Sequence, residues 1–163
     1  MCPVLSRFTL SSLLVLLSLI FILACSKDDK SEEPCPAPAL SPVNMNLDEL
    51  PHATLSDYNF FQGNMADLNP ELGVLPYELI SKLFTDYAEK KRFIWMPEDV
   101  SGSYVDDHDL ISLPTGAVLI KNFYYTNVLP SMSQRIVETR LIYNTGNGWA
   151  FAEYVWNDEQ TEA

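Results

Sequence analysis

The sequence predicts a β-rich α+β fold, in which an antiparallel sheet or sandwich follows one or two short N-terminal helices. Three segments in the last third are rich in the β-branched and aromatic residues that strands favour: 117–126, 135–143 and 148–156. The last two flank Asn144-Thr145-Gly146-Asn147-Gly148. An Asn-Gly step tolerates the positive φ angles that a hairpin turn needs. We therefore expect these two strands to pair as an antiparallel hairpin.

Two upstream segments predict the short helices. Thr54-Leu55-Ser56-Asp57 has the spacing of a capping box, in which the threonine hydroxyl accepts from a backbone N–H and the acid reaches back. Residues 79–88 carry apolar side chains at helical spacing, and the mostly basic residues 89–92 suit a helix C-terminus. Residues 92–96 are strand-like, and Pro97 ends that strand.

The first 24 residues differ in composition from the rest of the chain. They contain one charged residue, Arg7, and the run 13–24 is apolar except for Ser18. A basic start, a short apolar core and a small residue at the end are typical of a secretory signal peptide. The apolar stretch 8–24 is shorter than the roughly 20 residues that a spanning helix needs. We therefore expect residues 1–24 to be removed.

Ile22-Leu23-Ala24-Cys25 resembles the lipobox of bacterial lipoproteins. The resemblance implies cleavage before Cys25 and acyl chains, palmitate among them, on the mature N-terminus. Two or more acyl chains hold a protein stably on a bilayer. The next residues, 26–30, resemble a surface-export signal of lipoproteins in some Gram-negative bacteria. This implies a lipid anchor in the outer membrane and exposure at the cell surface, with the periplasmic face as the alternative.

A tether and one globular module are expected after the signal. Residues 25–46 hold four prolines, which favour an extended, semi-rigid stalk, and Cys35 within it has no partner thiol in the mature chain. Residues 47–163 are long enough for one core. The whole chain has 10 basic and 22 acidic side chains and a net charge of −12; removal of Arg7 makes it more acidic. Such a balance argues against nucleic acid as a partner.

The residues predict neither a catalytic site nor a metal site. Asp106-Asp107-His108-Asp109 is a dense group of hard ligands, but EF-hand spacing is absent and a solvated loop explains it better. No Gly-x-Ser-x-Gly motif occurs, and His52 and His108 both lie in polar stretches. Glu138 and Glu153 lie on neighbouring predicted strands, where pairing with Arg135 or Arg140 explains them.

Aromatic residues crowd the last strands. Alternation along a strand sends Trp149, Phe151 and Val155 to one face and Tyr154 and Trp156 to the other. One face is expected to be core, and the other a docking surface for another domain or a platform for sugar. The candidate partner or glycan contacts are Trp149, Tyr154 and Trp156.

Three parts of the module resemble a known family. They include Leu55-Ser56-Asp57-Tyr58-Asn59-Phe60-Phe61, Gly73-Val74-Leu75-Pro76-Tyr77-Glu78-Leu79 and Tyr154-Val155-Trp156-Asn157-Asp158-Glu159-Gln160-Thr161. They resemble the N-terminal module of secreted bacterial proteins of the diheme c-type cytochrome, or conserved repeat protein, family. The likeness spans residues 54–163.

The resemblance implies a lipid-anchored envelope module of an electron-transfer family, which docks against a haem domain or another envelope protein. Longer relatives carry Cys-x-x-Cys-His haem sites downstream, and this chain contains no such motif. No cofactor is therefore expected in this chain, and c-type haem is implied only for longer relatives. The chain is expected to be either C-terminally truncated or a free-standing version of the module. The alternative function is a surface-exposed glycan-binding β-domain.

Overall fold

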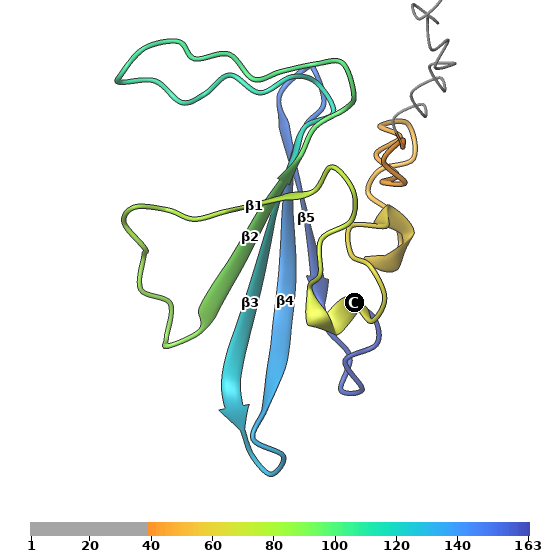
Figure 1. Cartoon of the computed structure of the whole chain (residues 1–163), viewed down its shortest axis with the longest axis vertical. Coiled ribbons are helices and arrows are strands. Elements are labelled where there is room, and N and C mark those ends of the chain that lie inside the picture. Colours follow the sequence, from red (N-terminus) through yellow and green to blue (C-terminus); the bar gives the residue numbers. More distant parts are fainter. Residues whose placement is uncertain (1–38) are drawn as a thin grey trace, which may run out of the picture. The chain divides into compact units, whose positions relative to one another are not determined.

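A single antiparallel sheet of five strands organises the chain (Figure 1). The computed structural model describes residues 39–163. The strands follow one another across the sheet in chain order: β1 (Leu75–Tyr77), β2 (Glu89–Trp95), β3 (Val118–Val128), β4 (Ser133–Asn144) and β5 (Trp149–Val155). The predicted β-rich antiparallel class is confirmed, and β3, β4 and β5 lie within one to two residues of the predicted segments. β2 overlaps the strand predicted at 92–96 but begins at Glu89, in the run assigned to a helix end. The short strand β1 was not predicted.

The N-terminal segment covers one face of this sheet. In Figure 1 the orange and yellow part of the chain runs beside the strands, with two short 3₁₀ turns, η1 (Ser56–Tyr58) and η2 (Met65–Asp67). Its apolar side chains pack against the inward side chains of the strands and exclude water from them. The buried core is made of Leu55, Tyr58, Phe60, Leu68, Val74, Phe93, Trp95, Val118, Ile120, Ile136, Leu141, Tyr143, Tyr154 and Trp156.

The packed domain begins before the predicted boundary at residue 47. Val43 and Met45 pack against the core, and the backbone N–H of Asn44 donates to the carbonyl of Tyr58. The signal peptide, Cys25, Cys35 and the tether up to residue 38 lie outside the described residues. Within residues 39–163, no helix has the length and apolarity needed to cross a membrane.

The predicted N-terminal helices are not confirmed: the segment after Thr54 forms only the 3₁₀ turn η1. Only half of the capping box forms. The N–H of Thr54 donates to the carboxylate of Asp57, but the Thr54 hydroxyl also donates to this carboxylate instead of accepting a backbone N–H. The turn then ends at Asn59, whose φ of 56° lies in the left-handed region and stops helix propagation.

Residues 79–88 form an exposed loop between β1 and β2 instead of the expected helix. Ile80, Leu83 and Phe84 project into solvent, so the apolar spacing has no core to pack against. A helix of ten residues is marginal without such packing. Asp86 and Tyr87 also have positive φ angles, which a right-handed helix excludes. The helical periodicity was therefore misleading.

The predicted hairpin between β4 and β5 is confirmed. Asn144 pairs with Trp149, and the N–H of Thr145 donates to the carbonyl of Gly148 across the turn. Gly146 has a φ of 86°, and its N–H donates to the Asn144 side chain. Alternation along β5 also follows the prediction: Tyr154 and Trp156 are buried, while Trp149, Phe151 and Val155 are exposed.

Candidate functional site

The sheet face opposite the N-terminal segment carries side chains in rows that cross several strands. In an antiparallel sheet, residues paired across neighbouring strands point to the same face. One such row runs through all five strands: Tyr77, Arg92, Lys121, Arg140 and Glu153. Its three central residues are cations on adjacent strands. We call these three residues, Arg92, Lys121 and Arg140, the cation row.

A second row lies two residues further along each strand. It is formed entirely by apolar side chains, which we call the apolar row: Leu75, Ile94, Leu119, Ile142 and Phe151. Both ends of this row are open to solvent, and Phe151 keeps 70% of its surface exposed. The sheet therefore presents an apolar strip beside a positively charged strip. We call the surface made by the two rows the open face.

The acids around the cation row neutralise it unevenly. Arg140 contacts two carboxylates, Glu138 at 2.6 Å and Glu153 at 3.7 Å. Lys121 has no carboxylate within 4.0 Å among residues 39–163; its Nζ lies 4.6 Å from the centre of the Phe123 ring. The Arg140 guanidinium approaches the same ring at 5.0 Å. The Phe123 ring thus makes cation–π contacts with both Lys121 and Arg140.

Arg92 is a nearly buried cation, with only 3% of its surface exposed. Its Nη1 is buried and has no hydrogen-bond partner within residues 39–163. The nearest acid is Glu78, whose Oε2 lies 3.7 Å from Nη1 and only 2.9 Å from Nζ of Lys82. A buried charge without full compensation is costly. Arg92 therefore adds positive potential to the open face, and the acids among the described residues do not fully neutralise this charge.

The pKa values respond to this arrangement. Burial lowers the pKa of Lys121, and the charges of Arg92, Lys90 and Arg140 lower it further, against a smaller opposing effect of Glu138. Burial raises the pKa of Glu138, and a hydrogen bond with Glu153 adds to this effect, although Arg140 acts in the opposite direction. The lysine thus lies in an environment that disfavours its charged form.

A groove of about 460 Å³ follows the boundary between the two rows. Lys121, Arg140 and Glu153 line it on the charged side, and Leu119, Ile142 and Phe151 on the apolar side. A space of this size holds a few side chains of a partner. The open face can therefore bind an anionic group and apolar groups together.

Lys121→Met should raise the free energy of unfolding by about 0.5–1 kcal/mol, because it removes a cation between two others while keeping contact with Phe123. Because folding lowers the pKa of Lys121, its positive charge makes the folded state less favourable at neutral pH. This free-energy cost disappears only as the pH approaches 10.5, the ordinary pKa of lysine. Urea unfolding at neutral pH measures the change. Lys82→Met, on the loop between β1 and β2, is the control. A less stable Lys121→Met would show that like-charge repulsion is not significant here.

The structure separates the three predicted contact residues. Trp149 is 45% exposed at the start of β5, whereas Tyr154 and Trp156 keep only 7% and 5% of their surface exposed and belong to the core. Tyr154 and Trp156 thus present almost no surface to a partner or glycan. Phe151, which was not among the predicted contacts, is the exposed aromatic residue in the groove.

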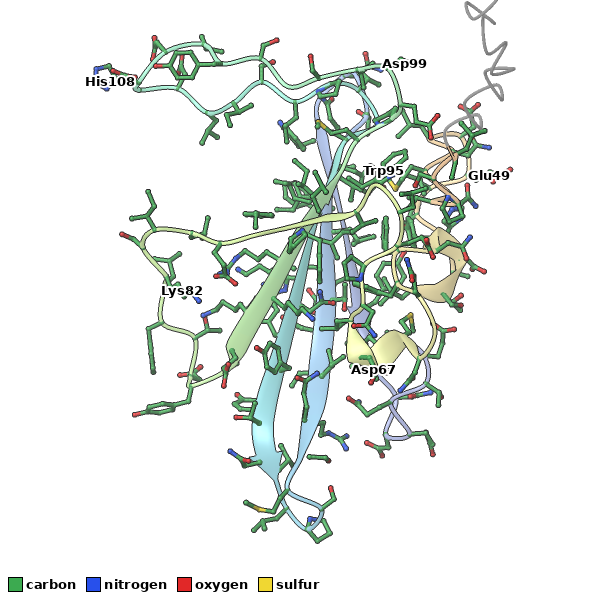
Figure 2. All side chains as sticks on the ribbon, viewed as in Figure 1. Glu49, Asp67, Lys82, Trp95, Asp99 and His108 are labelled. Carbon is green, nitrogen blue, oxygen red and sulfur yellow. The ribbon has the colours of Figure 1, made fainter. Side chains whose placement is uncertain are left out.

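The other polar groups singled out by sequence lie elsewhere or have local partners. His108 lies near the tip of the long loop between β2 and β3, away from the sheet (Figure 2). Asp106 there accepts the backbone N–H groups of His108 and Asp109, as a solvated loop does. Within residues 39–163, no group of three or more His, Cys, Asp or Glu side chains could hold a metal ion. Arg140 contacts Glu138 and Glu153, as expected.

The sequence shows the three cations of the cation row, but not that they are neighbours. Arg92 ends the basic run 90–92, which was assigned to a helix end, and Lys121 and Arg140 lie in separate strands. Only the strand register brings the three together. Their shared feature is a cation at an outward position, next to an inward apolar residue of the same strand.

Comparison with known proteins returned no match to a protein-family model, a curated protein or a solved structure.

Proposed function

We propose that the chain is a non-enzymatic docking module of the cell envelope, anchored through acyl chains on Cys25, that binds a partner protein through the open face. The observation that carries this proposal is the apolar row, which crosses all five strands and ends in the exposed Phe151. Sheet faces of this composition are normally buried against another layer. A partner would supply that layer.

The resemblance to diheme c-type cytochromes suggests the kind of partner. If it holds, the open face docks against a haem-bearing domain, and the haem belongs to that domain. This chain has no Cys-x-x-Cys-His motif to attach it. The lipid anchor and the tether would hold the module close to partners in the outer membrane, which raises their effective concentration.

A photoreactive amino acid at Phe151 tests the docking surface. The full chain, with its signal, is expressed in cells that make the lipoprotein, and the cells are irradiated before extraction. We expect a covalent product with a defined protein from Phe151 and from Leu75, at opposite ends of the apolar row. The same probe at Glu159, exposed but outside the open face, is the control and should give none. Equal yields at all three positions would reject the open face as the docking surface.

A glycan-binding surface is the second candidate, because Trp149 and Phe151 expose their rings on the same face of β5. Aromatic rings at the surface can stack on sugar. In the same experiment, a product at Phe151 that carries carbohydrate instead of polypeptide would favour this alternative.

Cys25→Ser should release the protein from the membrane, because the serine cannot carry the thioether-linked diacylglycerol and a chain with a net charge of −12 is repelled by anionic lipid. The measurement is the share of the protein in the membrane fraction, with incorporation of labelled palmitate measured in parallel. Cys35→Ser is the matched control and should leave both unchanged. A Cys25→Ser variant that stays in the membrane fraction and still incorporates palmitate would refute the anchor.

A further inference from the structure

We infer that the open face recognises an acidic side chain of its partner: a carboxylate lies over Lys121 and Arg140, and aliphatic side chains of the same segment lie over the apolar row. This inference rests on the proposed docking function and specifies the chemistry of the docked segment. That segment is a stretch of polypeptide with one acid among apolar residues.

The charge distribution supports a carboxylate. Lys121 has no carboxylate within 4.0 Å among residues 39–163, and it lies between the cations Arg92 and Arg140 in the strand register. Like charges directly opposite each other on a sheet are destabilising. An anion above Lys121 would relieve both contacts at once. It would meet an ammonium and a guanidinium, which together form strong charge-assisted hydrogen bonds to a carboxylate.

Arg92 gives this argument a second, independent basis. Its guanidinium is almost fully buried, and its Nη1 lacks a hydrogen-bond partner within the described part of the chain. Glu78, its closest acid, is shared with Lys82. Arg92 therefore contributes charge from beneath the surface, while Lys121 and Arg140 line the groove and make the contact.

The spacing of the two rows defines the shape of the segment. The rows are two residues apart along each strand, which corresponds to roughly 7 Å. Residues i and i+2 of an extended segment match this separation, and residues one turn apart on a helix come close to it. The docked segment should thus carry its acid two to four residues from an aliphatic side chain.

The composition of the groove argues against a sugar as the ligand, and the charge of the chain argues against a polyanion. The apolar row is aliphatic except for Phe151, whereas sugar recognition relies on flat aromatic surfaces. Phe123 is buried and already contacts Lys121 and Arg140. A polyanion would also be repelled by a chain with a net charge of −12. A single carboxylate in an apolar segment avoids that repulsion.

The test combines the photoreactive residue at Phe151 with changes at Lys121 in the full-length, lipid-anchored chain. Lys121→Arg keeps the charge and should keep the cross-linked product. Lys121→Glu should lower its yield by about tenfold or more, because it places two acids together. Thermal melts of both variants check that the fold is intact. Mass spectrometry then maps the linked segment, and its acidic residue is changed to lysine. This change alone should abolish the product, and combining it with Lys121→Glu should restore it.

Several outcomes would overturn the inference while leaving the docking function standing. These are an unchanged yield with Lys121→Glu, a linked segment with no acid within four residues of an apolar side chain, or failure of the charge exchange to restore the product. A carbohydrate adduct would overturn it in favour of a glycan. No product at Phe151 in the otherwise unchanged chain would instead reject the proposed function, and the inference would fall with it.

Discussion

Thr139→Val is expected to lower the free energy of unfolding by about 2–4 kcal/mol, although valine has nearly the same shape as threonine. Thr139 is fully buried on β4 and lies in the middle of a polar chain inside the core. The indole Nε1 of Trp156 donates to its hydroxyl at 3.0 Å, and the hydroxyl donates to Oδ1 of Asn122 at 2.6 Å. Valine would leave both partners without this hydrogen bond.

The cost is large because the partners are buried as well. Asn122 is fully buried, and its side-chain nitrogen donates to the carbonyl of Lys91 at 3.3 Å, so its position on β3 is fixed. Trp156 is held by the core just after β5. Neither side chain can turn toward water, and an unsatisfied buried polar group costs about 1–3 kcal/mol. Two such groups, each in the lower half of this range at about 1–2 kcal/mol, give the expected total of about 2–4 kcal/mol.

Urea unfolding followed by tryptophan fluorescence measures this loss. Thr126→Val is the matched control, because Thr126 lies on the exposed end of β3 and its hydroxyl donates only to the exposed Glu89. We expect this variant to change the free energy of unfolding by less than about 0.5 kcal/mol. If the two variants were equally stable, the buried hydrogen bonds of Trp156, Thr139 and Asn122 would not stabilise the fold by the expected amount.

The strands could be predicted from the sequence because local chemistry determines them. Residues 117–126 and 135–143 are rich in β-branched and aromatic residues, and the Asn-Gly turn before Trp149 favours a hairpin. The short β1 could not be predicted in this way. Its three residues include Pro76, and it forms by pairing with the edge of β2 across the loop of residues 78–88.

The helix predicted at residues 79–88 does not form for a related reason. The spacing in residues 79–88 is a local property, but a helix of that length depends on burying its apolar face. The core of this protein is filled by residues 43–74 and the inward faces of the strands, and Ile80, Leu83 and Phe84 do not pack against it. A sequence pattern cannot show whether a partner surface exists.

The candidate site depended on register more than on residue type. Lys121 and Arg140 are ordinary outward residues in their own strands. They become neighbours because Lys121 pairs with Arg92 on one side and with Arg140 on the other. A shift by one residue would send each strand's cation to the core face. The predicted contacts Tyr154 and Trp156 show the converse, since their aromatic character suggested a surface while the register assigns them to the core.

Alkaline pH should destabilise the protein, and Tyr154 should account for much of this effect. Its hydroxyl donates to the carbonyl of His52 at 2.8 Å and accepts from the hydroxyl of Tyr58 at 2.7 Å. The Tyr58 hydroxyl in turn accepts the N–H of His52 at 3.1 Å, which leaves Tyr154 as its acceptor. Burial raises the pKa of Tyr154 far above its ordinary value of 10.0, and the hydrogen bond with Tyr58 adds to this effect.

The sign of the effect follows from proton counting. Above about pH 10 the unfolded chain releases the Tyr154 proton, whereas the folded chain keeps it. The contribution of Tyr154 to the free energy of unfolding is therefore fully present below this pH. It falls as the pH rises, by about 1.4 kcal/mol per pH unit for this one group. Tyr154→Phe should be about 1–2 kcal/mol less stable at neutral pH, because it leaves the His52 carbonyl without its donor. Its stability should fall less steeply above pH 10.

Urea unfolding of both proteins from about pH 8 to about pH 11.5 compares the two slopes. We expect the stability curves to converge as the pH rises, since the phenylalanine variant has no proton to release at this position. Tyr87→Phe, which removes a hydroxyl from the exposed loop before β2, is the matched control and should follow the parent protein. Parallel curves for Tyr154→Phe and the parent would mean that the ring of hydrogen bonds at Tyr58, Tyr154 and His52 does not hold the phenol in its protonated form.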